Sequence, residues 1–109
     1  MITVTVYRES ELPVGFSVSG HANMGAYGED LVCAAVSAVV QTAILGITEI
    51  CRISAGVSIE EGETVCILSK DAGTDEIQRA GIVMNTMIAG LRSIRQSYPK
   101  TLKFRNKEV

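Results

Sequence analysis

The sequence contains a single histidine, His21, and a cysteine twelve residues later, Cys33. These two residue types catalyse acyl transfer together, because a deprotonated cysteine attacks a carbonyl carbon while a neighbouring imidazole accepts and returns the proton. Taken singly, each has a simpler explanation: Cys33 as a small buried apolar residue, and His21 as a surface or capping group. The predicted elements around the two residues favour the catalytic interpretation.

Cys33 lies near the predicted start of a long helix. From about residue 30 to residue 50 the chain is rich in Ala, Val, Ile and Leu, which predicts a helix of about 30 Å. The unpaired N–H groups of a first helical turn stabilise a thiolate and can hold the oxyanion that forms during acyl transfer. Because residues three and four apart share a helix face, Asp30, Cys33 and Ser37 are expected to align.

The residues around Cys33 allow more than one role. Asp30 either orients the imidazole or caps the helix, and Ser37 bonds either to the catalytic pair or to the helix backbone. Glu29 and Asp30 also place negative charge beside Cys33, which is expected to disfavour a thiolate and to oppose a helix-dipole effect of about 0.3–1 kcal/mol. His21 must therefore supply most of the activation of Cys33.

The rest of the chain predicts an α+β domain in the order ββαββαβ, with a mostly antiparallel sheet packed against two long helices. Alternating apolar residues predict strands near residues 2–7 and 16–19, so that His21 follows a strand end. A second predicted hairpin surrounds the turn Glu60-Glu61-Gly62. A second helix is expected from an N-cap at Thr74 to Pro99, followed by a last strand over residues 101–106.

The two predicted helices differ in pattern. The second carries one apolar stripe, at Ile77, Ala80, Gly81, Met84, Met87, Ile88, Leu91 and Ile94. The first is apolar nearly all round, which predicts burial on most sides, in the core or also at a subunit interface. A membrane span is the less favoured interpretation, because Ser37, Gln41 and Thr42 interrupt the apolar run.

Composition limits the possible functions. The 109 residues are expected to form one domain, 1–109, with 47% apolar and 20% charged residues. The three cysteines form no CxxC pair and one histidine cannot complete a finger-type site, so we expect no metal and no other cofactor. Free thiols and the absence of a signal-peptide pattern predict a cytoplasmic protein.

The charge is unevenly distributed. A net charge of −2 argues against direct nucleic-acid binding, yet six of the ten basic residues lie near the carboxyl terminus. A solvated face or an edge strand is the preferred explanation, ahead of a contact with RNA or an acidic partner. The six residues are Arg92, Arg95, Lys100, Lys103, Arg105 and Lys107.

Two motifs resemble those of a known family. "GHA" at Gly20–Ala22 and "GEDLVCAAVS" at Gly28–Ser37 are similar to the motifs of the ribosomal-processing cysteine protease family, called Prp or YsxB-like. The resemblance extends over the whole chain in length and element order. It implies His21 as the catalytic histidine and Cys33 as the nucleophile, with Asp30 and Ser37 beside them.

The resemblance also implies a substrate and an assembly. Family members are small cytoplasmic homodimers that remove a short amino-terminal extension from the large-subunit ribosomal protein numbered twenty-seven, after a motif ending in two aromatic residues. A mobile loop with glycine pivots would close over this peptide. Met24 and Tyr27 either contact its aromatic side chains or are solvent-facing loop residues. The residues assigned to this substrate loop are Ala22, Asn23, Met24, Gly25, Tyr27 and Gly28.

Two other functions are compatible with the sequence. The first is a non-enzymatic dimeric module that binds to the ribosome, with Cys33 as core filler. The second keeps the Cys/His pair as a hydrolase but gives it another acyl substrate, such as a thioester, in a compact pocket. An unreactive Cys33 thiol would favour the first of these alternatives.

Overall fold

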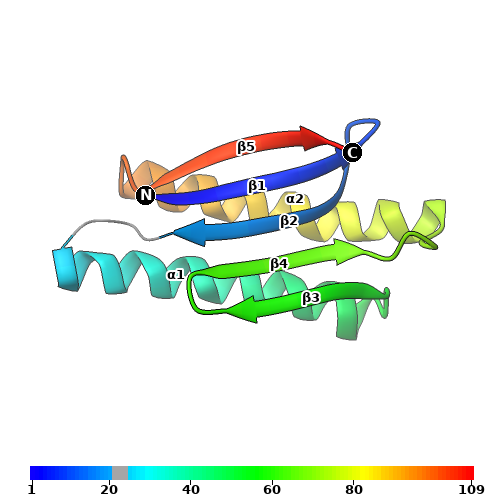
Figure 1. Ribbon diagram of the computed structural model, residues 1–109, viewed down its shortest axis with the longest axis horizontal. Coiled ribbons are helices and arrows are strands. Elements are labelled where there is room, and N and C mark those ends of the chain that lie inside the picture. The colour runs from blue at the N-terminus through cyan, green and yellow to red at the C-terminus, as the bar shows by residue number, and fades with distance from the viewer. Residues whose placement is uncertain (21–24) are drawn as a thin grey trace.

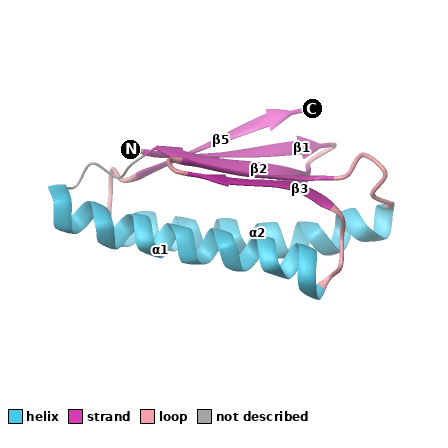
Figure 2. Ribbon diagram, turned by 60° about the horizontal axis from the view of Figure 1, so that its bottom comes forward, coloured by secondary structure: helices cyan, strands magenta, loops and turns pink. Residues whose placement is uncertain are grey.

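In the computed structural model, five strands form one mixed sheet with two long helices on one of its faces (Figures 1 and 2). The structure describes the backbone of residues 1–20 and 25–109, and the side chains of residues 1–20 and 31–109. In chain order the elements are β1 (Ile2–Glu9), β2 (Leu12–Gly20), α1 (Gly25–Leu45), the π-helical turn η1 (Gly46–Ile50), β3 (Ala55–Glu60), β4 (Glu63–Leu68), α2 (Thr74–Ser97) and β5 (Leu102–Glu108). The predicted α+β class and the order ββαββαβ are confirmed.

The strand order in the sheet is β3-β4-β2-β1-β5. The two hairpins pair antiparallel as predicted, and β2 joins them by pairing antiparallel with β4. The last strand lies beside the first and runs parallel to it, with Ile2 opposite Leu102. The strands β3 and β5 therefore form the two edges of the sheet.

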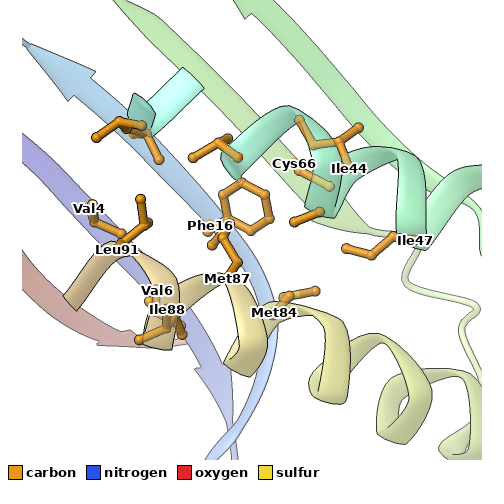
Figure 3. Packing of buried hydrophobic residues seen from close by; sticks show 14 of the residues in the cluster. Val4, Val6, Phe16, Ile44, Ile47, Cys66, Met84, Met87, Ile88 and Leu91 are labelled. Atoms are coloured by element: carbon orange, nitrogen blue, oxygen red, sulfur yellow. The ribbon is translucent and has the colours of Figure 1, made fainter. Parts of the chain in front are cut away.

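The hydrophobic core fills the space between the sheet and the helices (Figure 3). Phe16 of β2 is fully buried and lies between Met84 and Met87 of α2 and Ile44 of α1 (Figure 3). Six of the eight residues of the predicted α2 stripe are buried, and Ile77 and Ile94 at its ends pack partly buried against the core. The period-3.6 pattern therefore identified the core face of α2 correctly.

The helix boundaries differ from the predictions. Helix α1 begins at Gly25 instead of near Asp30, and its regular part ends at Leu45 instead of Ile50. Glycine weakens a helix by only about 1 kcal/mol relative to alanine, so Gly25 and Gly28 do not prevent one from forming. At α2, Gly73 is the N-cap and Thr74 the first helical residue, because the Gly73 N–H donates to the Glu76 carboxylate over 3.0 Å.

The expectation that α1 is buried on most sides is wrong for the single chain. The segment Leu31–Ile50 has a mean hydropathy of 2.1 and is long and apolar enough to cross a membrane, yet only 33% of it is buried. Its core face carries Val32, Val36, Val40, Ala43 and Ile44. Because the helices cover only one face of the sheet and lie side by side, the outer face of α1 stays exposed (Figure 2).

Candidate active site

Cys33 lies in the third turn of α1, eight residues after its first residue, Gly25. Within a helix the N–H groups beyond the first turn bond to carbonyls four residues earlier. The prediction that first-turn amides next to Cys33 hold an oxyanion is therefore wrong. The cause is the earlier start of α1, which includes Gly25–Gly28 of the segment that was expected to be a loop.

The Cys33 side chain is half-buried and lines a cavity of about 270 Å³ between α1 and the β3–β4 turn. Ser37 lines the same cavity, so the predicted alignment of these two residues is confirmed. Gln41, one further turn along α1, continues the same polar row. Gln41 was not predicted as a site residue, although its spacing of four from Ser37 places both on one helix face.

The opposite wall of the cavity comes from the β3–β4 hairpin, for which no site role was predicted from the sequence. A cavity between distant segments depends on strand order, and no local pattern shows it. The residues that this hairpin contributes are Ile59, Glu60, Glu61, Gly62, Glu63 and Thr64. Three of the six are acidic, and the described lining contains no Lys or Arg, so the cavity is expected to attract cationic groups.

Gly20 lines the cavity at the end of β2 and has φ of 95°. A Cβ atom at this position would lie 2.5 Å from the Met1 carbonyl oxygen, so only glycine fits without a shift of the backbone. The Gly20 N–H donates to the carbonyl of Gly62 over 3.1 Å, which ties the strand end to the β3–β4 turn. The chain thus enters position 21 from the edge of the cavity.

Several predicted site residues lie outside the described residues. These are His21, Ala22, Asn23 and Met24. The backbone of Gly25, Tyr27, Gly28 and Asp30 is helical, but their side chains also lie outside the described part of the chain. The pairing of His21 with Cys33, the role of Asp30 and the substrate contacts of the loop therefore stay predictions. Among the side chains of residues 1–20 and 31–109, no three His, Cys, Asp or Glu come together as a metal site.

The other two cysteines occupy structural positions. Cys66 is fully buried in β4, and burial raises the pKa of its thiol from 9.0 to about 11. Cys51 follows η1, and its carbonyl accepts a hydrogen bond of 3.0 Å from the Arg79 guanidinium. All three thiols are free. Cys33 is the one that lines this cavity, as a nucleophile requires.

A two-layer α+β fold that presents a half-buried cysteine in a cavity is compatible with a small cysteine protease, and comparison with known proteins establishes this class. The chain belongs to the cysteine protease Prp family, whose family model matches residues 1–103. It is 30% identical over 109 residues to the ribosomal processing cysteine protease Prp of Staphylococcus aureus, covering 98% of this chain and 100% of that one. The Prp of Bacillus subtilis is 29% identical over 106 residues, covering 94% and 95%.

Solved structures agree with this membership. The essential ribosomal processing protease Prp from S. aureus, in complex with a covalently linked product peptide, superposes with a TM-score of 0.83. Its sequence is 27% identical, and the match covers 98% of this chain and 100% of that one. A protein from Streptococcus mutans, 20% identical with a TM-score of 0.82 over 100% and 96% of the two chains, shares the fold. The protein is thus an enzyme, and the non-enzymatic alternative is set aside.

Proposed function

We propose that this protein is the endopeptidase that removes the amino-terminal extension of the large-subunit ribosomal protein numbered twenty-seven, with Cys33 as nucleophile and His21 as base. The observation that carries the proposal is the half-buried thiol of Cys33 in a cavity that Gly20 also lines. His21 directly follows Gly20 in the sequence, which supports its assignment as the base. The relatives' description as ribosomal processing proteases supports the substrate class.

The chemistry is acyl transfer. His21 accepts the Cys33 proton, and the thiolate attacks the scissile carbonyl to give a tetrahedral oxyanion. The intermediate collapses to a thioester as His21 protonates the departing amine, and water, deprotonated by His21, then hydrolyses the thioester. We assign an oxyanion contact to the Ser37 hydroxyl, because it lies one turn from Cys33 on the same helix face and lines the same cavity.

The charge of the cavity supports a cationic peptide as substrate. Glu60, Glu61 and Glu63 line it together with the nucleophile. An amino-terminal segment carries an α-ammonium group, and ribosomal proteins are rich in Lys and Arg. Attraction between opposite charges in a cleft raises the rate of encounter and lowers KM, most strongly at low salt.

The decisive experiment incubates the purified protein with the full-length precursor of that ribosomal protein and follows its mass. We expect loss of the extension at one bond and a single new amino terminus. An intact precursor, together with rapid hydrolysis of a small thioester by the same sample, would replace the proposal with the hydrolase alternative. The Cys33→Ala variant is the control for contaminating proteases.

We also propose that the protein is a cytoplasmic homodimer. Three free cysteines suit a reducing compartment. Leu31 and Leu45 on the outer face of α1 are 47% and 50% exposed, and Val57 on the neighbouring edge strand β3 is 41% exposed. Burial of these side chains against a second copy would stabilise a dimer. Sedimentation should show a dimer that Leu45→Glu dissociates, whereas Ile82→Glu on α2 should not.

A further inference from the structure

The charges of this protein are separated onto the two edges of its sheet. Edge strand β5 carries Lys103, Arg105 and Lys107, all exposed, at every second position. The alternating positions face the core: Leu102, just before the first cation, is buried, and Phe104 packs partly buried against the core. Since side chains alternate between the two faces of a strand, the three cations project from the face opposite the helices.

On the same face of the sheet, the two strands next to β5 carry side chains with hydroxyl groups. In the register, Thr3, Thr5 and Tyr7 of β1 lie opposite Lys103, Arg105 and Lys107, and Ser17 and Ser19 of β2 lie opposite Thr5 and Thr3. The helices cover only the other face of the sheet (Figure 2). We name this surface, made of the eight residues just given, the basic sheet face.

The basic sheet face contains no carboxylate, and within the described part of the chain none of its three cations makes an ion pair. The acidic residues of the same open face lie at its margins: Glu63 of β4 lies opposite Ser19 and pairs with Glu60 of β3, and Glu9 follows Tyr7 at the end of β1. Charged side chains, Lys above all, protect an edge strand against aggregation. That role concerns β5 alone and does not account for the hydroxyl-bearing residues that β1 and β2 add beside it.

The helix side of the same edge is also positive. The guanidinium groups of Arg95 and Arg92 lie 4.7 Å and 5.8 Å from the centre of the Phe104 ring. These stacking contacts hold two further cations beside β5. The net charge of −2 is thus a sum in which the positive charges around β5 are offset by acidic residues elsewhere in the chain.

We propose that the basic sheet face binds RNA through its phosphate backbone. The cations repeat every second residue of a strand, about 6.6 Å apart, close to the spacing of successive phosphates along an RNA strand. Phosphates and sugars need only cations and hydrogen-bonding groups, which Lys, Arg, Ser and Thr supply. A protein partner needs an apolar centre, and the exposed apolar side chain of this part of the sheet, Ile67 of β4, lies beyond Gly15 and away from the three cations.

The experiment measures binding of a fluorescein-labelled 16-nucleotide oligouridylate to the full chain by anisotropy at 50 to 200 mM salt. Three phosphate contacts predict that affinity falls about 20-fold over this range. The double variant Lys103→Gln with Arg105→Gln should bind more weakly and retain about a third of the salt slope. A matched double variant, Arg52→Gln with Lys70→Gln, removes the same charge from exposed positions elsewhere and should bind like the wild type.

Peptide cleavage and thermal unfolding of both double variants should match the wild type, because the four substituted side chains are exposed and none of them lines the cavity. Three outcomes would overturn the proposal: no binding at 50 mM salt, an equal loss of affinity in the matched variant, or equally tight binding of a poly-glutamate peptide of the same charge. The last would assign the face to an acidic protein partner.

Discussion

The backbone N–H of Gly20 donates a hydrogen bond to the carbonyl of Gly62 over 3.1 Å. This bond joins the end of β2, one residue before His21, to the turn that forms the far wall of the Cys33 cavity. Both residues have positive φ, 95° and 84°. The two glycines nevertheless differ in their surroundings, so that substituting each one tests how tightly the neighbouring backbone is packed at this edge of the cavity.

Replacement of Gly20 by alanine should destabilise the protein more than replacement of Gly62. Both variants place a side chain at positive φ, which costs about 1–2 kcal/mol. A Cβ at position 20 would also lie 2.5 Å from the Met1 carbonyl, whereas none of the described atoms lies within 4 Å of one at position 62. Urea denaturation should show an additional loss of about 1–3 kcal/mol for Gly20→Ala. Equal losses would show that the chain end simply moves aside.

Replacement of Cys33 by alanine should lower kcat/KM for the extension peptide by about 10³-fold or more, because the covalent route is lost. Thermal unfolding should change little, since the side chain is only partly buried. The matched control is Cys51→Ala, which removes a half-buried thiol away from the cavity and should keep full activity. Full activity of Cys33→Ala would exclude the proposed mechanism.

Replacement of His21 by alanine should slow alkylation of Cys33 by iodoacetamide at pH 7 by about tenfold or more, because the imidazole favours the thiolate. Mass spectrometry of the modified peptide distinguishes Cys33 from the other two thiols. Raising the pH should restore the rate in the variant, since hydroxide then ionises the thiol. An unchanged rate at pH 7 would remove His21 from the activation of the nucleophile.

Neutralising the acidic wall should weaken substrate binding without slowing the chemical step. In Glu60→Gln with Glu61→Gln, KM for a lysine-containing extension peptide should rise several-fold at low salt, with kcat nearly constant. The effect should shrink above about 0.5 M salt, because screening shortens the range of the interaction. The pair Glu9→Gln with Glu49→Gln, away from the cavity, is the charge-matched control. A KM that is independent of salt in the wild type would contradict this role.

The buried thiol of Cys66 should make stability depend on alkaline pH. Burial raises the pKa of Cys66 from 9.0 to about 11, so the folded state keeps a proton that the unfolded chain loses. Stability is therefore constant below pH 9 with respect to this group and falls as the pH rises to 11, by at most about 3 kcal/mol. Urea denaturation of Cys66→Val should lack this component. Parallel pH profiles of variant and wild type would refute it.

Local sequence patterns predicted most of the helices and strands, but not which elements pack or pair with one another. Alternation at Ile2, Val4 and Val6 and the stripe around Met84 reflect burial on one side, which the sequence records directly. The parallel pairing of β1 with β5, and the wall that Glu60 and Glu61 place opposite Cys33, depend on long-range strand order. No local periodicity encodes that order.

The predicted start of α1, near Asp30, differs from the observed start at Gly25 for another reason. Gly25 and Gly28 suggested a loop, but the cost of two glycines in a helix is small beside the packing of the apolar face that follows, which includes Val32 and Val36. Cys33 therefore lies in the interior of the helix and not at its end as predicted. Its alignment with Ser37 was unaffected, because that depends on spacing alone.

The pairing of β1 with β5 has a consequence for biosynthesis. Ile2 lies opposite Leu102, and the Ile2 N–H donates to the Thr101 carbonyl over 2.8 Å, so nearly the whole polypeptide separates the two partners. Until β5 has been synthesised, the outer edge of β1 is unpaired. Its backbone N–H and C=O groups can then pair with a strand of another chain. The sheet is thus complete only after β5 has been synthesised, and emergence of the first hairpin does not complete it.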